Sequence, residues 1–267
     1  MKKSLLIFFL TFLLDMIYAQ QTYFNKRYNY GYVAWSVLET DSGYSCLVGS
    51  NGILILNIDF NGNIRSEKLY NMSQTILYAG GPGSLIKTND NNHAFAGSIE
   101  DTANPNVMLW KLNSEGDTLW TQRYGDTAWQ AANQCKQTPD NGFIVIGRTA
   151  TTDYDGDFWL IKTDSLGNVQ WDKTYGGQYY EYGLSVDVCE DGGYILGGVT
   201  RSFGINPGPF CQNADNIFVI KVDSSGNEQW NRVYGDSFAD GAWNIEQTKD
   251  GGYVLTGYYG VGVISCP

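Results

Sequence analysis

Short runs of consecutive apolar residues recur along this chain, and a turn rich in Asp, Ser, Gly and Asn follows each run. Two clear examples are Phe158–Ile161 and Ile217–Ile220. A strand with one face in water alternates apolar and polar residues, whereas these runs are apolar at every position. The pattern therefore predicts short β-strands that are covered on both faces by other sheets.

A tight corner precedes an apolar strand at five places. Each corner begins with Asp, and three positions later it has Tyr, Phe or, once, His93. The corners begin at Asp41, Asp90, Asp140, Asp191 and Asp250, at intervals of 49, 50, 51 and 59 residues. Corners of this composition are hairpin signals because their residues tolerate the positive φ of tight turns. For His93, a role in the turn or strand is favoured over a role as general base.

A second motif lies between the corners, and in it Gly precedes Tyr by eight residues with a Trp midway. Its four copies run over 62–70, 116–124, 167–175 and 226–234. The first copy has Ser66 where the other three have Trp120, Trp171 and Trp230. Two interleaved motifs in constant order indicate that the chain is built from structural repeats.

Together the motifs divide each repeat into four strands, and a four-stranded repeat of about 40–50 residues is typical of a propeller blade. We therefore predict an all-β fold, a β-propeller of four-stranded blades with about five repeats visible. Phe24–Tyr28 has the spacing of a fourth strand, and in many propellers such an N-terminal strand completes the last blade. The final repeat contains only two clear strands, so the ring is either one strand short or incomplete because the chain is truncated. Truncation at the C-terminus is favoured.

The first residues have the features of an export signal. Lys2 and Lys3 precede the apolar run Leu5–Leu14, and Ala19 offers a small residue at a cleavage point. The run is too short to cross a bilayer as a helix. We predict a signal peptide over 1–19, a propeller domain over 20–267, no transmembrane segment, and a secreted or cell-surface location. The net charge of −11 disfavours nucleic acid as a partner.

Three segments carry a family resemblance. They are Trp171–Gly177 (Trp-x-x-x-Tyr-Gly-Gly), Asp191–Tyr194 (Asp-Gly-Gly-Tyr) and Asp157–Asn168 (Asp-Phe-x-x-Ile-Lys-x-Asp-x-x-Gly-Asn). In these motifs the chain resembles a family of exported repeat proteins of bacteria that use the type IX secretion route. The resemblance covers nearly all of 20–267. It implies a secreted or cell-surface protein of unassigned biochemistry, often with a C-terminal sorting domain, which is not recognised in this sequence.

The Asp-x-x-Gly-x-x-x-Trp element also resembles the docking motif of quinoprotein-type propellers, in which Trp packs between blades. This second resemblance supports the blade architecture. The enzymes of that class usually have adjacent cysteines, and this sequence has no Cys-Cys pair. The five cysteines also match no metal-site spacing. Cys189 with Cys211 is the first pair to test for a disulfide, but a role as small apolar strand residues is favoured for Cys46, Cys135 and Cys189.

Tyrosines gather in two connections that are expected to cross one end of the propeller. Tyr30, Tyr32, Tyr179, Tyr180 and Tyr182 are candidates for stacking on sugar rings or anchoring a protein partner. Packing between blades is the favoured alternative for these residues.

Acidic residues supply the remaining candidates. Asp153, Asp155 and Asp157 surround Gly156 and are candidate calcium ligands, although the full EF-hand spacing is absent and a polar loop is favoured. Asp187, Glu190 and Asp191 lie close enough in sequence to suggest glycoside hydrolysis, but a carboxylate present in every repeat is more often structural. We identify no catalytic residues and no cofactor.

The sequence therefore favours a non-catalytic binding or scaffold module that recognises an unidentified protein or glycan. A carbohydrate-binding or carbohydrate-active protein is the first alternative, and a quinoprotein-like redox enzyme is the second.

Overall fold

The computed structural model describes residues 28, 33–50, 52–70, 76–81, 83–100, 105–151, 155–205, 215–236 and 238–260. Within these ranges, every regular element is a β-strand, and the strands form five antiparallel sheets. No helix in the described part is long and apolar enough to cross a membrane. The predicted signal peptide lies outside the described residues.

The sheets follow one another along the chain, and in sheets 1, 3, 4 and 5 the strands are hydrogen-bonded in sequence order. Sheet 1 contains β1 (Val33–Thr40), β2 (Gly43–Ser50), β3 (Gly52–Ile58) and β4 (Ile64–Tyr70). Sheet 2 contains β5 (Ile76–Ala79), β6 (Leu85–Lys87), β7 (His93–Glu100), β8 (Asn106–Leu112) and β9 (Thr118–Tyr124). Sheet 3 contains β10 (Trp129–Gln137), β11 (Phe143–Ala150), β12 (Asp157–Thr163) and β13 (Val169–Tyr175). Sheet 4 contains β14 (Glu181–Val188), β15 (Tyr194–Thr200), β16 (Asn216–Val222) and β17 (Glu228–Tyr234), and sheet 5 contains β18 (Asp240–Gln247) and β19 (Tyr253–Tyr259).

Sheet 2 departs from the four-stranded plan because its first strand is interrupted. Both β5 and β6 pair with β7, and Gly80 and Gly81 lie between them. A Cβ on Gly80 would approach the backbone oxygens of Ala96 and Asn133 to 2.4 and 2.6 Å, so only glycine fits there. Sheet 2 is therefore a four-stranded blade with a broken inner strand.

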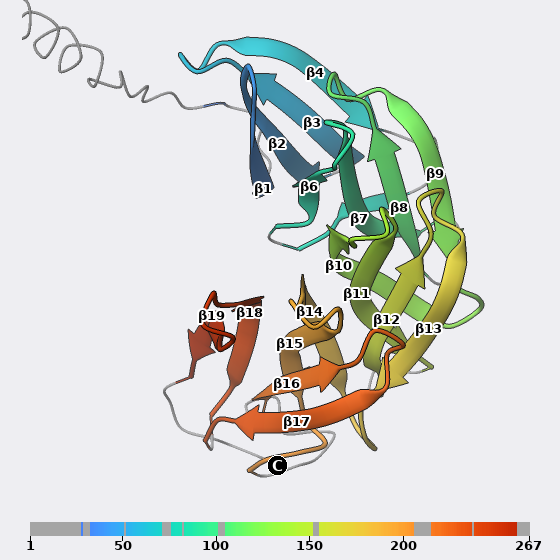
Figure 1. Cartoon of the computed structure of the whole chain (residues 1–267), viewed down its shortest axis with the longest axis vertical. Helices are drawn as coiled ribbons and strands as arrows, with labels where there is room; N and C mark the ends of the chain where they lie inside the picture. Colours follow the sequence, from blue (N-terminus) through green and yellow to red (C-terminus); the bar gives the residue numbers. More distant parts are fainter. Residues whose placement is uncertain are drawn as a thin grey trace, which may run out of the picture.

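The sheets pack face to face around a common axis, as Figure 1 shows. β7 lies against β10, β11 against β14, and β15 against β18. The third strands are covered on both faces as predicted, and β3 and β8 are buried at every position. The arrangement is a β-propeller, which confirms the predicted fold class. Its blades form an open arc with β1 near one end and β18–β19 at the other (Figure 1).

The second sequence motif joins sheets 1 to 4, each to the next. The hydroxyl of Tyr124 donates to the carbonyl oxygen of Gly167 (2.8 Å), and that of Tyr175 donates to the carbonyl oxygen of Gly226 (2.7 Å). The glycines adopt φ values of 79° and 75°, which favour glycine. The same bond at Tyr70 and Gly116 joins sheets 1 and 2. We call this bond the tyrosine latch.

The N-terminal strand predicted over Phe24–Tyr28 is described only at its last residue. The Tyr28 hydroxyl donates to the carbonyl oxygen of Gly62 at 2.7 Å, so it makes a tyrosine latch on sheet 1. Tyr28 therefore occupies the place that the last residue of a preceding blade would take.

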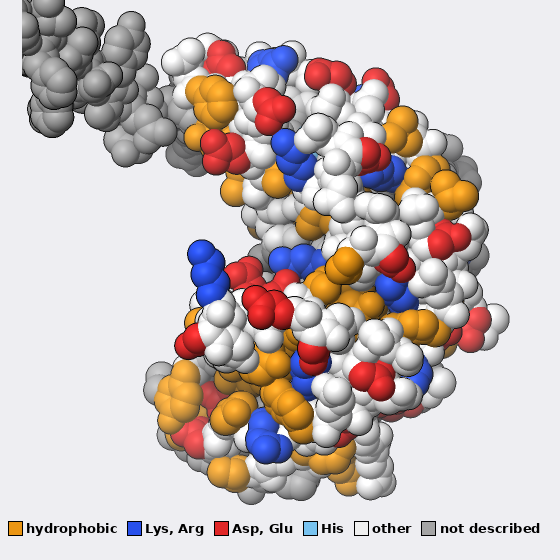
Figure 2. Space-filling view, in the orientation of Figure 1, with side chains coloured by type: hydrophobic (Ala, Val, Ile, Leu, Met, Phe, Trp, Pro, Cys, Tyr) orange, Lys and Arg blue, Asp and Glu red, His pale blue; other side chains and the backbone are white. Residues whose placement is uncertain are grey.

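Sheet 5 exposes large apolar side chains. Tyr259 is 67% exposed and Val254 51% exposed. Figure 2 shows hydrophobic side chains gathered over the part of the molecule that sheets 4 and 5 form. In the middle of the arc, by contrast, each sheet has a neighbour on both faces.

The described cysteines are free thiols that belong to strands or to a corner. Cys135 and Cys189 are buried, and burial raises the pKa of Cys135 to about 12 and of Cys189 to about 11. Cys211 lies outside the described residues, so its pairing with Cys189 stays a prediction.

Candidate functional site

The first strands of the sheets (β1, β5–β6, β10, β14 and β18) lie nearest the propeller axis, and we call them the inner strands (Figure 1). A cavity of about 350 Å³ lies where these strands converge. All five sheets contribute to its lining, which is mainly apolar and aromatic. Representative residues, one from each sheet in order, are Trp35, Gly80, Trp129, Tyr182 and Trp243. We call this space the axial cavity.

A β-bulge directs side chains into the axial cavity. The inner strands of sheets 1, 3, 4 and 5 each show a register shift near the middle of the strand. Bulges re-aim a side chain and are common next to binding sites. The residues at the four shifts all line the cavity, and they are Trp35, Asn133, Leu184 and Trp243.

The residue after each bulge ties the inner strands together. Gln134 accepts a hydrogen bond from the backbone N–H of Val186 at 2.8 Å. In the next sheet, the Ser185 hydroxyl accepts one from the backbone N–H of Ile245 at 3.1 Å. The same position in sheet 1 is Ser36, whose hydroxyl accepts from the N–H of Leu85. These bonds hold neighbouring inner strands at a set distance, so the cavity is preformed.

Two arginines order the aromatic residues at one side of the cavity. The Arg148 guanidinium lies 4.9 Å from the ring centre of Trp129 and 4.4 Å from that of Tyr180. Arg201 also lies on Tyr180, at 4.7 Å. Burial, more than any neighbouring charge, raises the pKa of Tyr180. Cation–π contacts of this kind fix the rings, so Tyr180 supports the site by packing.

The other predicted tyrosines have different positions. Tyr182 lines the axial cavity, and its hydroxyl donates to Asn133 at 3.2 Å. Tyr179 lines a separate depression of about 290 Å³ beside Asp155 and Asp157. Tyr30 and Tyr32 lie outside the described residues. Of the three candidates that the structure describes, Tyr182 lines the cavity.

The calcium candidates Asp155 and Asp157 share the depression that contains Tyr179. A Cβ on Gly176 would lie 1.9 Å from Asp157 Oδ1 and 2.7 Å from Glu181 Oε2, so both acids lie against this glycine. Burial, with the charge of Glu181 second, raises the pKa of Asp157 to about 6. Glu181 accepts hydrogen bonds from Thr200, Ser202 and Gly177 and orders the surrounding loops.

Among the described residues, no group of three or more His, Cys, Asp and Glu side chains is arranged to hold a metal ion. Asp153 lies outside the described residues. Calcium binding by Asp153, Asp155 and Asp157 stays a prediction.

The corner aspartates have the structural role that their recurrence suggested. Asp140 pairs with Lys162 and Asp191 pairs with Lys221, each at 2.8 Å. These lysines lie within the third strands and are almost fully buried. Asp187 contacts Lys136 and accepts a hydrogen bond from the backbone N–H of Gln247. The three acids considered for glycoside hydrolysis are thus not gathered in the axial cavity.

Sequence reasoning missed the three tryptophans of the axial cavity. Trp35 and Trp243 stand at equivalent bulge positions, each following an alanine. An alignment of the inner strands would have shown that these two strands share an Ala-Trp pair at the same position. The bulge itself has no clear sequence mark, because Asn133 and Leu184 occupy the same position in the other sheets.

Comparisons with known proteins yield structural similarities only. No family model and no curated protein matches this chain. A protein of unknown function from Bacteroides caccae is 11% identical, with 78% of this chain and 84% of that chain covered and a TM-score of 0.35.

An alpha-L-arabinofuranosidase from Clostridium thermocellum is 13% identical over 78% of this chain and 74% of that chain, with a TM-score of 0.48. BamB from Moraxella catarrhalis is 13% identical over 83% of this chain and 71% of that chain, with a TM-score of 0.37. These TM-scores are below 0.5, so the similarities carry no argument about what this chain does.

Proposed function

We propose that this chain is a non-catalytic binding module whose ligand occupies the axial cavity. The main observation that supports this proposal is that bulges in four inner strands direct side chains toward one preformed space. Trp35 and Trp243 line that space and are 38% and 45% exposed. Concave sites with aromatic walls and a few polar groups are typical of ligand binding.

A glycan is the ligand class that this lining favours. Aromatic rings offer flat apolar faces to the C–H faces of sugar rings. Asn133, Ser98 and Glu100 add hydrogen-bonding groups that suit sugar hydroxyls. The predicted export signal and the repeat resemblance support a secreted or cell-surface location, where glycans are accessible.

The test is a glycan array, followed by calorimetry on the strongest ligand. We expect Trp35→Ala and Trp243→Ala each to weaken binding by about tenfold or more, as at other aromatic hot spots. Tyr234→Ala is the matched control, because Tyr234 is exposed on the outer strand β17. Its affinity should stay unchanged.

Two outcomes would contradict the proposal. One is the absence of binding to every glycan together with no other ligand that responds to the tryptophan substitutions. The other is turnover of a polysaccharide that a single point substitution abolishes, since this would make the chain an enzyme.

A further inference from the structure

The interface between sheets 1 and 2 departs from the repeat at a position where the others bury an aromatic pair. At the other interfaces, the Trp of the fourth strand packs on the corner aromatic residue of the next sheet. The pairs are Trp120–Phe143 (5.8 Å), Trp171–Tyr194 (6.1 Å) and Trp230–Tyr253 (5.7 Å between ring centres). Between sheets 1 and 2, the two positions hold Ser66 and His93. Both replacements are smaller, so ring volume is lost from this interface alone among the four.

A third departure lies beside the first two. The third strands of sheets 2, 3 and 4 carry a buried lysine, whereas sheet 1 has Asn57 at the equivalent position. At the next interface, Lys111 reaches over the ring of Phe143, with Nζ 5.9 Å from its centre. Asn57 is shorter than lysine, and its side-chain amide is hydrogen-bonded within sheet 1. It accepts from the Ser45 hydroxyl (2.5 Å) and donates to the Ser66 hydroxyl (2.9 Å). Three repeat positions thus lose volume at the same interface, two in sheet 1 and one in sheet 2.

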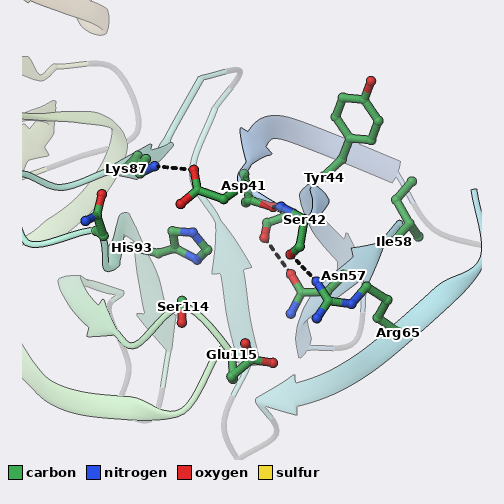
Figure 3. A pocket seen from close by; sticks show the side chains of 13 residues that line it. Asp41, Ser42, Tyr44, Asn57, Ile58, Arg65, Lys87, His93, Ser114 and Glu115 are labelled. Atoms are coloured by element: carbon green, nitrogen blue, oxygen red, sulfur yellow. Dashed lines mark hydrogen bonds and ion pairs between the residues drawn. The ribbon is translucent and has the colours of Figure 1, made fainter. Parts of the chain in front are cut away.

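A cavity of about 160 Å³ lies at this interface. Figure 3 shows His93 projecting into it between Asp41 of the sheet 1 corner and Ser114 of the following turn in sheet 2. Asn57 and Ile58 form part of the opposite wall. An engineered protein cavity of about 150 Å³ accommodates benzene, so the space suits a single planar ring.

His93 lines the cavity and carries a buried hydrogen-bonding atom without a partner among the described residues. The side chain is 2% exposed, and its Nδ1 has no hydrogen-bond partner among the described residues. A buried polar atom without a partner is unfavourable, so such atoms commonly mark a missing ligand or water. Burial lowers the pKa of His93, with the charges of Lys87 and Lys111 as further causes. The imidazole is therefore neutral at pH 7, with one nitrogen as donor and the other as acceptor.

The two cationic side chains that line the cavity are already partnered. Lys87 Nζ lies 3.1 Å from Asp41 Oδ1, and Arg65 donates to the hydroxyl of Ser42 (Figure 3). The carboxylate of Glu115 also lines the cavity. An incoming anion would have to break one of the cation contacts and would be repelled by Glu115, so the rim disfavours a negatively charged ligand.

We propose that this inter-sheet cavity binds a small, planar ring that has no negative charge and carries a hydrogen-bonding group, of the phenol or azole class. The ring takes the volume that a tryptophan or lysine side chain fills at the other interfaces. Its polar group bonds to His93. This site is separate from the axial cavity and does not depend on the function proposed for it.

The histidine itself provides the measurement, because His93 is the only histidine in the chain. Its ring resonances in an NMR spectrum are therefore assigned without ambiguity. Phenol, imidazole and benzene are titrated separately into the full chain at pH 7.5. We expect saturable shifts of the His93 ring signals with phenol or imidazole, and a dissociation constant for benzene about fivefold higher, since benzene lacks the hydrogen bond.

Two variants that restore the repeat refill the cavity. Ser66→Trp supplies the missing indole, and Asn57→Lys supplies the missing lysine. We expect both to abolish the ligand-induced shifts, while the dispersion of the remaining spectrum shows that the fold is kept. Trp35→Ala in the axial cavity is the control and should leave the titration unchanged.

The proposal fails if no ring compound shifts the His93 signals of the original chain. It also fails if the shifts persist in both refilled variants, or if benzene binds as tightly as phenol and imidazole. If either Ser66→Trp or Asn57→Lys does not fold, the titration of the other variant still tests the proposal.

Discussion

The interface between sheets 3 and 4 and the interface between sheets 1 and 2 use the same repeat positions in different ways. Both have a tyrosine latch, from Tyr175 to Gly226 in the first case and from Tyr70 to Gly116 in the second. Only the first also has the aromatic pair, Trp171 on Tyr194. The latch therefore sets the relative position of two blades, whereas the aromatic pair fills volume between them. Where the pair is missing, the blades still stack and a cavity remains.

The largest expected effect comes from removing the ring at the filled interface. Trp171→Ser should destabilise the protein by about 2–3 kcal/mol, because a partly buried indole is lost and a cavity opens. Ser66→Trp, the opposite change at the other interface, should alter stability by less than about 1 kcal/mol. Urea unfolding followed by circular dichroism measures both. Equal destabilisation by the two substitutions would show that the interfaces do not differ in packing.

A smaller effect is expected at the buried lysine of sheet 4. Lys221 is 3% exposed on its side chain and donates to Asp191 at 2.8 Å, so Lys221→Met should cost about 2 kcal/mol. Lys249→Met, at an exposed lysine of a corner, should stay within about 0.5 kcal/mol. The same unfolding assay compares them. If Lys221→Met leaves the free energy of unfolding unchanged, a well-packed apolar side chain replaces this ion pair without loss of stability.

The tyrosine latch gives the next prediction. Tyr175→Phe removes one buried hydrogen bond and should lower the free energy of unfolding by about 1 kcal/mol. Tyr234 holds the same motif position, but it is 52% exposed at the end of sheet 4. Tyr234→Phe should therefore have no measurable effect. If the two variants lose stability equally, the latch is not what distinguishes their positions.

The smallest effect is the pH dependence of a corner. The hydrogen bond from Lys221 holds the pKa of Asp191 below its usual value. Its stabilising contribution is therefore complete above the unfolded pKa of about 4 and is lost as the pH falls through the lower folded pKa. The side chain of Asp191 is 53% exposed, so the contribution is modest.

Asp191→Asn should consequently be less stable than the original chain at pH 7, and the difference should shrink below about pH 4. Urea midpoints at several pH values measure this. Asp250→Asn is the comparison, since no lysine among the described residues bonds to Asp250 as Lys221 bonds to Asp191. If the stability difference between Asp191→Asn and the original chain is the same at every pH, the lowered pKa of Asp191 does not contribute to stability.

Much of the fold was readable from the sequence because its signals are local. The corner glycines and aspartates mark turns, and the runs of consecutive apolar residues in the third strands require cover on both faces. The departures at Ser66 and His93 were also visible as breaks in the motifs. The two lie 27 positions apart, and nothing in the motifs indicated that they border one interface.

The candidate site was only partly predictable. Tyr182 was identified from its place in a tyrosine-rich connection, but the same reasoning included Tyr180, which packs between two arginines. Tyr180 lies just before β14 and Tyr182 lies within it, so the position of each ring depends on what the tertiary structure places beside it.

By itself, the sequence determined the repeat, the strands and the face-to-face packing of the sheets, since these follow from periodicity within a few residues. Only the tertiary structure decided where space remains. The axial cavity is formed by residues from all five sheets, and the inter-sheet cavity by residues from two. A cavity is the volume that side chains distant in sequence leave unfilled, so it exists only once the sheets are stacked.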